Sequence, residues 1–118
     1  MWTIKLSQEA KKSLKNYDKP IQKQILAGIQ KVSRNPLPHP NGYGKPLGKK
    51  HGNNLTGFFK IKYRDIGIRV VYSLVLEVNI MNILIISERD DNYCYEMATR
   101  LYDKFGDRVF EDIFEEFE

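Results

Sequence analysis

The sequence contains one cysteine and two histidines among its 118 residues, and this scarcity excludes whole classes of site. Cys94 cannot form a disulfide within the chain, and a cysteine-based zinc site is not available either. His39 and His51 lack the spacing and the companion ligands of a metal site. We therefore expect no metal and no small-molecule cofactor, and a reducing compartment is compatible with this composition.

Long hydrophobic runs are missing as well. The longest apolar stretch is far shorter than the roughly 20 residues that a membrane-spanning helix needs. The N-terminal run Met1-Trp2-Thr3-Ile4-Lys5 leads directly into a polar segment rather than into the apolar core of a signal peptide. We therefore expect a cytoplasmic protein with no membrane partner.

Positive charge is present in excess, and it is unevenly distributed. The net charge of the whole chain is +4. From residue 102 to the end, seven Asp or Glu residues stand against two Lys or Arg residues, a net charge of −5 that leaves +9 on residues 1–101. A basic body favours a polyanionic partner such as nucleic acid. The alternative is a basic surface that serves solubility alone.

The length predicts one domain, whose N-terminal part contains a strand and two helices. Thr3 to Leu6 has the pattern of a short strand, and Ser7 is a good N-cap for a helix that continues to about Tyr17. Asp18 caps a second, amphipathic helix that ends at Asn35-Pro36. Because the connection is short, we expect an antiparallel helical hairpin packed on one face of a sheet.

The middle of the chain predicts a three-stranded antiparallel meander. Its strands are the β-branched or aromatic runs Phe58 to Arg64, Ile68 to Leu76 and Ile80 to Ser87. With the N-terminal strand they would form a four-stranded sheet in total. The segment from Asn35 to Asn54 is rich in proline and glycine, which predicts a long irregular loop. The fold class is therefore α+β.

The C-terminal part predicts two helices. The first covers Asp91 to about Lys104, and the second begins after Gly106. The apolar stripe of the second helix is formed by Val109, Phe110, Ile113, Phe114 and Phe117. We expect residues 102–118 to be an acidic helical extension packed on the domain of residues 1–101. Their opposite charges motivate the hypothesis that this extension covers the basic surface, and the alternative is that it only completes the core.

The first strand of the meander carries a basic strip. Lys60, Lys62 and Arg64 alternate with apolar residues, and because strand side chains alternate between the two faces, the three cations share one face. On residues alone, the solvated face of an antiparallel sheet is the preferred interpretation.

Further cations surround this strip. Arg69 is the only cation of the second strand, so it projects from the same face or pairs with Glu88 or Asp90. Arg89 follows directly where the third strand ends. The preceding loop contributes Lys45, Lys49 and Lys50, which either extend the basic surface or remain solvated.

These residues also carry a resemblance to a known family. The chain resembles the RelE/ParE superfamily of bacterial toxins from type II toxin–antitoxin systems in its order of elements, which is a strand, a helical hairpin and a basic loop. It also resembles this superfamily in the motifs Lys45-Pro46-Leu47, Lys60-Ile61-Lys62 and Gly67-Ile68-Arg69-Val70-Val71-Tyr72. The resemblance covers residues 1–101. The spacing from Lys60 to Lys62, Arg69, Arg89 and Tyr95 is similar to that of the ribosome-dependent RelE branch.

The resemblance implies an endoribonuclease that cleaves messenger RNA in the ribosomal A site and so inhibits translation. The 2′-hydroxyl of the substrate would be the nucleophile, giving a 2′,3′-cyclic phosphate without a metal. By resemblance, Lys62 is the general base, Lys60 and Arg69 stabilise the phosphate and the transition state, and Arg89 is a stabiliser or proton donor. Tyr95 would stack on or orient a nucleobase; the alternative is a core position within its helix. Lys45, Lys49, Lys50 and Arg64 would bind RNA, and the implied partners are a cognate antitoxin, messenger RNA and the 70S ribosome.

Two alternatives remain open within the same fold. One is a ParE-like inhibitor of DNA gyrase, and the other is a catalytically degenerate RNA-binding homologue. The presence of Lys60, Lys62, Arg69, Arg89 and Tyr95 together favours the nuclease, because a gyrase-binding surface does not require that constellation.

Overall fold

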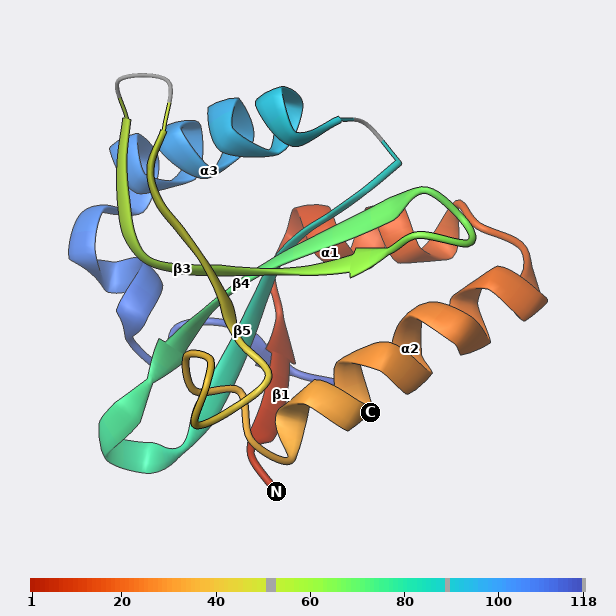
Figure 1. Ribbon diagram of the computed structural model, residues 1–118, viewed down its shortest axis with the longest axis horizontal. Helices are drawn as coiled ribbons and strands as arrows, with labels where there is room; N and C mark the ends of the chain where they lie inside the picture. Colours follow the sequence, from red (N-terminus) through yellow and green to blue (C-terminus); the bar gives the residue numbers. More distant parts are fainter. Residues whose placement is uncertain (51–52, 89, 118) are drawn as a thin grey trace.

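The computed structural model describes residues 1–50, 53–88 and 90–117 and has three layers (Figure 1). A central sheet contains six strands in the order β2-β3-β4-β5-β1-β6. The helices α1 (Gln8–Lys15) and α2 (Lys19–Ser33) bury their apolar sides against one face of this sheet. The helix α3 (Asp91–Phe105) packs against the other face. The α+β class and the hairpin on one sheet face are confirmed, whereas the expected four-stranded sheet is wrong.

The starts of the first two helices follow the expected capping chemistry. The side chain of Ser7 accepts a hydrogen bond from the backbone N–H of Ala10, and the side chain of Asp18 accepts one from Ile21. These bonds satisfy donors that have no partner inside the helix. Two separately capped helices therefore follow one another closely along the chain, as the sequence predicted.

The meander is confirmed, although its first strand begins five residues earlier than the sequence predicted. Its strands are β3 (Asn53–Tyr63), β4 (Ile68–Val75) and β5 (Ile80–Ser87), which pair antiparallel in that order. The short strand β1 (Thr3–Leu6) lies parallel to β5. A 3-10 turn, η1 (Leu76–Val78), joins β4 to β5.

The expected irregular loop instead contains a strand. β2 (Lys45–Lys50) pairs antiparallel with β3, which itself begins at Asn53. Pro46 is tolerated because β2 is an edge strand, and the pairing register shifts between Pro46 and Gly48, where Gly48 has a φ of +65°. This strand was missed because its six residues include Pro46, Gly48 and three lysines, which leave no hydrophobic alternation in the sequence.

The C-terminal extension is also different from the expected second helix. It forms a 3-10 turn, η2 (Gly106–Phe110), and a two-residue strand, β6 (Glu115–Glu116), which pairs with β1 at the far edge of the sheet. Its acidic side chains contact the N-terminal part of the chain, in the ion pairs Lys5–Asp112 and Lys11–Glu115. The extension also packs on β3 through the contact of Phe110 with Phe58, but its described ion pairs are with Lys5 and Lys11 rather than with the basic strip.

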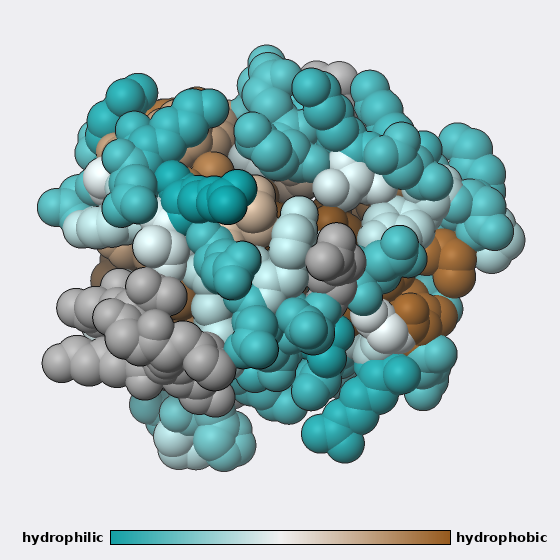
Figure 2. All heavy atoms as spheres, turned by 90° about the horizontal axis from the view of Figure 1, so that it is seen from above, coloured by the Kyte–Doolittle hydropathy of each residue, from teal (hydrophilic) through white to brown (hydrophobic). Residues whose placement is uncertain are grey.

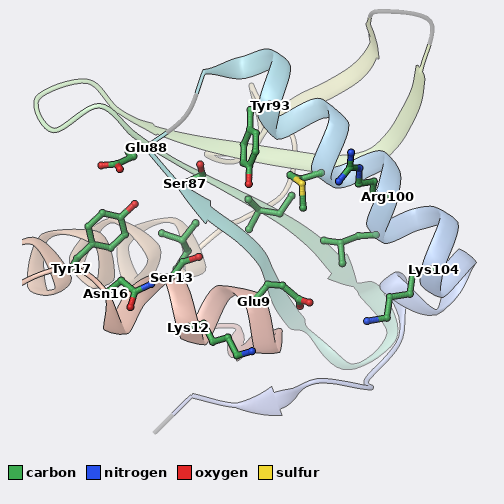
Figure 3. Close-up of a pocket in the computed structure, with 14 residues that line it drawn as sticks. Glu9, Lys12, Ser13, Asn16, Tyr17, Ser87, Glu88, Tyr93, Arg100 and Lys104 are labelled. Carbon is green, nitrogen blue, oxygen red and sulfur yellow. The ribbon is translucent and has the colours of Figure 1, made fainter.

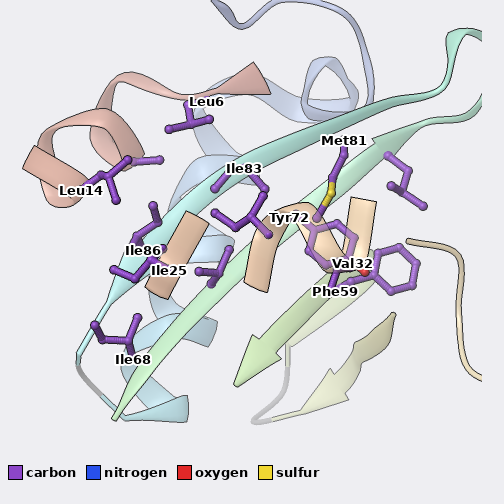
Figure 4. Close-up of a cluster of buried hydrophobic side chains, with 14 residues drawn as sticks. Leu6, Leu14, Ile25, Val32, Phe59, Ile68, Tyr72, Met81, Ile83 and Ile86 are labelled. Carbon is purple, nitrogen blue, oxygen red and sulfur yellow. The ribbon is translucent and has the colours of Figure 1, made fainter. Parts of the chain in front are cut away.

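Two hydrophobic clusters hold the layers together. The larger one joins the helical hairpin to the sheet and includes Ile25, Tyr72 and Ile83 (Figure 4). Close packing there depends on Gly28, where a Cβ atom would lie 2.4 Å from the hydroxyl oxygen of Tyr63. That hydroxyl donates a 2.5 Å hydrogen bond to the carbonyl of Ile25, which fixes the end of β3 against α2. No helix in the described part of the chain is long and apolar enough to cross a membrane.

Candidate functional site

Three predicted site residues lie together on the sheet face that α3 covers. Lys60 and Lys62 are on β3, and Lys62 is the direct pairing partner of Arg69 on β4. Neighbouring Phe59 and Ile61 point to the opposite face, where they pack into the hairpin cluster. The strand period of two therefore separates an apolar underside from a cationic upper side, as the sequence predicted. We call Lys60, Lys62 and Arg69 the cation cluster.

A single carboxylate, that of Asp91, lies among the three cations. Its Oδ1 accepts a 2.5 Å hydrogen bond from Nε of Arg69, and its Oδ2 lies 3.8 Å from Nζ of Lys60 and 4.0 Å from Nζ of Lys62. Asp91 is the first residue of α3, where a negative charge also interacts favourably with the helix dipole. The cation cluster together with Asp91 is thus built from three elements, two strands and one helix N-terminus.

The cluster controls the ionisation of Asp91. Partial burial by itself raises the pKa of this carboxyl group, but the hydrogen bond from Arg69 and the charges of Lys60, Arg69 and Lys62 outweigh it and lower the pKa below its ordinary value. Asp91 is therefore ionised at neutral pH. One negative charge faces three positive charges, which leaves the site with a net positive charge.

Of the two placements expected for Arg69, the structure shows the one on the face of the basic strip. There Arg69 donates a hydrogen bond to Asp91, a contact that the sequence did not predict. Asp90 instead caps α3 by accepting a hydrogen bond from the backbone N–H of Tyr93. In the sequence, Asp91 stood out only as an acidic residue in the first turn of a predicted helix. That position does not indicate a contact with the two strands that carry the cations.

The predicted RNA-binding residues surround the cluster unequally. Lys45 is the direct pairing partner of Lys60, so it lies on the same sheet face, and it is exposed. Arg64 is exposed just after the end of β3. The surface on the side of α3 is predominantly hydrophilic (Figure 2). Arg89 lies outside the described residues, as do the side chains of Lys49 and Lys50 on β2.

Tyr95 does not present its ring at the surface. Its side chain is only 2% exposed and belongs to the cluster beneath α3, together with Cys94 and Ala98. The expected stacking on a nucleobase is wrong for this structure, and the alternative of a core position is confirmed. Burial also raises the pKa of the Cys94 thiol to about 11, so that this thiol is protonated and packs as a small hydrophobic group.

A groove of about 640 Å³ lies on the other side of α3, between this helix and α1 (Figure 3). Tyr17 and Lys12 line it from the α1 side, and Tyr93 and Arg100 line it from α3. Tyr93 follows Asp91 by two residues, which places the two side chains on opposite sides of the helix. The groove is therefore separate from the cation cluster, although the end of β5 and the first turn of α3 border both. Within the described residues, no group of three or more His, Cys, Asp or Glu side chains is arranged to hold a metal ion.

A comparison with models of protein families identifies the family of the chain. The family model described as the ParE toxin of type II toxin–antitoxin systems, parDE, matches residues 4–93. The chain belongs to this family. It is thus a toxin of the RelE/ParE superfamily, and the resemblance stated from its sequence motifs is confirmed. None of the curated proteins matches.

Solved structures show the same fold for the ParE-family chain. The isolated RelE toxin of E. coli has a TM-score of 0.60 and 20% identity, covering 86% of this chain and 99% of that one. The toxin–antitoxin complex RelBE2 of Mycobacterium tuberculosis has a TM-score of 0.59 and 24% identity, with 75% and 98% covered. The RelE–RelB complex of Pyrococcus horikoshii has a TM-score of 0.54 and 18% identity, with 76% and 97% covered. At these identities the likeness establishes the fold alone.

Proposed function

We propose that this toxin is a ribosome-dependent endoribonuclease and that its cation cluster acts on a phosphodiester of messenger RNA in the ribosomal A site. The observation that carries the proposal is the convergence of Lys60, Lys62 and Arg69 around one carboxylate. Cations brought together from two strands form a site for an anion with several oxygens, and a phosphodiester is such an anion. The fold shared with RelE toxins supports this choice of substrate.

The reaction would need a base, stabilising cations and an acid. The substrate 2′-oxygen attacks the adjacent phosphorus while its proton moves to the base, and the bond from phosphorus to the 5′-oxygen breaks. The products are a 2′,3′-cyclic phosphate and a 5′-hydroxyl end, which takes up a proton. Negative charge accumulates on the phosphoryl oxygens during this step, so that fixed cations lower the barrier.

The side chains of the cation cluster differ in solvent exposure, and this difference suits them to different roles. The Lys62 side chain is 35% exposed, against 17% for Lys60, so Lys62 is the better placed of the two to reach a substrate hydroxyl and act as the base. Lys60 and Arg69 are held closer to the sheet and would stabilise the phosphoryl charge. Arginine stays protonated in proteins, which makes Arg69 a charge stabiliser rather than an acid. Arg89 remains the proposed fourth member.

The proposed function implies an antitoxin and the ribosome as partners and the cytoplasm as the compartment. We infer a cognate antitoxin whose acidic or amphipathic segment neutralises the cation cluster, as the complexes of the RelE relatives with their antitoxins support. The substrate complex would be messenger RNA on the 70S ribosome, and the toxin would therefore act in the cytoplasm.

A second candidate function is ParE-like inhibition of DNA gyrase, and the match to the ParE toxin family favours it. Two assays on the same preparation separate the candidates. A nuclease shortens a reporter messenger RNA in a purified translation reaction and leaves gyrase supercoiling unchanged. A gyrase inhibitor gives the reverse result, and RNA binding without either effect would indicate a degenerate homologue. Arg108→Ala, which removes an equal charge from the exposed η2 turn, is the matched control for Arg69→Ala.

A further inference from the structure

The carboxylate of Asp91 occupies the position where the proposed function requires a phosphate. Its two oxygens share the three cations. Oδ1 accepts the hydrogen bond from Arg69, and Oδ2 lies beside Lys60 and Lys62. Two non-bridging phosphate oxygens would make the same set of contacts, because a carboxylate and a phosphate offer similar charge-assisted bonds to these side chains. The three cations cannot serve both anions fully at once.

We propose that Asp91 is a built-in competitor of the substrate phosphate, which RNA must displace from the cation cluster in order to bind. This inference rests on the proposed function and concerns the regulation of the same site. Asp91 lowers the affinity of the free toxin for polyanions in general. Only an RNA whose phosphate is positioned well enough to displace the Asp91 carboxylate binds to the cation cluster. The negative charge of Asp91 thereby makes the site selective for correctly positioned RNA.

The local structure allows the Asp91 side chain to leave. It is 35% exposed, and it does not cap α3, because Asp90 accepts the capping hydrogen bond from Tyr93. Breaking the contact with Arg69 therefore does not remove the N-cap of the helix. The positive end of the α3 dipole remains beside the cluster and favours the incoming anion just as it favours Asp91.

The opposite role for Asp91 predicts the opposite result. If Asp91 were needed to orient Arg69 for RNA, its removal would weaken RNA binding. If Asp91 competes with RNA, Asp91→Asn strengthens binding, because the net charge of the site rises by one while the shape of the side chain is kept. The sign of the change distinguishes the two roles.

The test measures binding of a single-stranded RNA oligonucleotide with 2′-O-methyl groups, which lacks the nucleophile and cannot be cleaved. We compare the wild type, Asp91→Asn, Arg69→Ala and Asp103→Asn, which makes the same charge change at an exposed position of α3. Asp91→Asn should bind about fivefold more tightly at low salt. The slope of log affinity against log salt should steepen by about 0.7, the amount expected for one further phosphate contact on a single strand. Asp103→Asn should remain close to the wild type.

The outcomes separate this inference from the proposed function. Binding by Asp91→Asn that is equal to Asp103→Asn, or weaker than the wild type, overturns the competitor role and leaves the proposed RNA site intact. Binding by Arg69→Ala that is as tight as the wild type contradicts the RNA site and the inference with it.

A second measurement uses the unmodified protein. The Nε–H of Arg69 can be followed by nuclear magnetic resonance after assignment with Arg69→Lys. Addition of the same oligonucleotide should shift this resonance as the bond to Asp91 is exchanged for a bond to phosphate. A resonance that stays in place while the RNA binds would overturn the proposal, whatever the stability of the variants.

Discussion

The hydroxyl of Ser73 on β4 donates a 2.6 Å hydrogen bond to the main-chain carbonyl of Val109 in the η2 turn. The side-chain amide of Asn82 on β5 donates to the same carbonyl at 3.1 Å. Both side chains are fully buried, so that the C-terminal extension is attached to the sheet by polar contacts inside the core. The two donors occupy the carbonyl that a continuous helix would pair with the backbone N–H of Ile113, and that N–H donates to Glu111 instead.

The two donors should therefore substitute for each other in part. Ser73→Ala should lower the free energy of unfolding by about 1 kcal/mol, because Asn82 still donates to the Val109 carbonyl. The double variant with Asn82→Ala should lose more than the sum of the single variants, since a buried carbonyl is then left unpaired. Urea unfolding measures the coupling, with Ser13→Ala on the groove side of α1 as a control of small effect. Strict additivity would argue against a shared acceptor.

Removal of the end of the extension should affect stability and not RNA binding. Truncation after Glu111 removes β6, the ion-pair partners of Lys5 and Lys11, and the aromatic ring of Phe117 packed against the core. These contacts lie at the edge of the sheet beyond β1, away from the cation cluster. The melting temperature should fall, and RNA affinity should stay within about twofold of the full chain, as for distant independent sites. A large gain in RNA affinity would mean that the extension shields the site.

Replacement of Tyr95 should cause a defect in folding stability rather than in RNA contact. Tyr95→Ala should cost about 3–5 kcal/mol, because an aromatic side chain removed from a packed core leaves a cavity. Tyr43→Ala is the matched control, since Tyr43 is 49% exposed and its loss should cost little. The comparison uses urea unfolding of both variants. A stable Tyr95→Ala protein with reduced RNA affinity would restore a direct role for the ring.

The stability of the toxin should depend on pH through Asp91. The folded pKa of this carboxyl group lies below its ordinary value of about 3.9, so ionised Asp91 stabilises the fold fully above that value. This stabilisation is lost as the pH falls through the lower, folded pKa. The difference in unfolding free energy between the wild type and Asp91→Asn should thus shrink between about pH 5 and pH 2. A difference that does not vary with pH would show that the carboxylate gains nothing from the cations.

Local signals in the sequence predicted most of the fold. Ser7 and Asp18 have capping side chains, and the alternation at Lys60 and Lys62 correctly assigned both cations to one face of the sheet. Such features depend on neighbours within a few residues, and local chemistry determines them.

The failures share one physical cause, which is contact between residues distant in the sequence. β2 includes Pro46 and Gly48 and is held by main-chain pairing with β3. Its side chains lack the alternation of apolar and polar residues that predicts a strand. Asp91 meets Arg69 only because α3 folds back over the sheet. The stripe containing Tyr95 was compatible with a core position and with a surface one, and tertiary packing selected the core.

The central claim, that the cation cluster cleaves messenger RNA on the ribosome, is tested most directly by mapping RNA 5′ ends in a purified translation reaction. Reactions contain the wild type, Arg69→Ala or the control Arg108→Ala, each with and without ribosomes. The proposed function predicts new 5′-hydroxyl ends inside codons for the wild type and the control, only when ribosomes are present, and none for Arg69→Ala. Ends produced equally by Arg69→Ala, or no ends from the folded wild type, would contradict it.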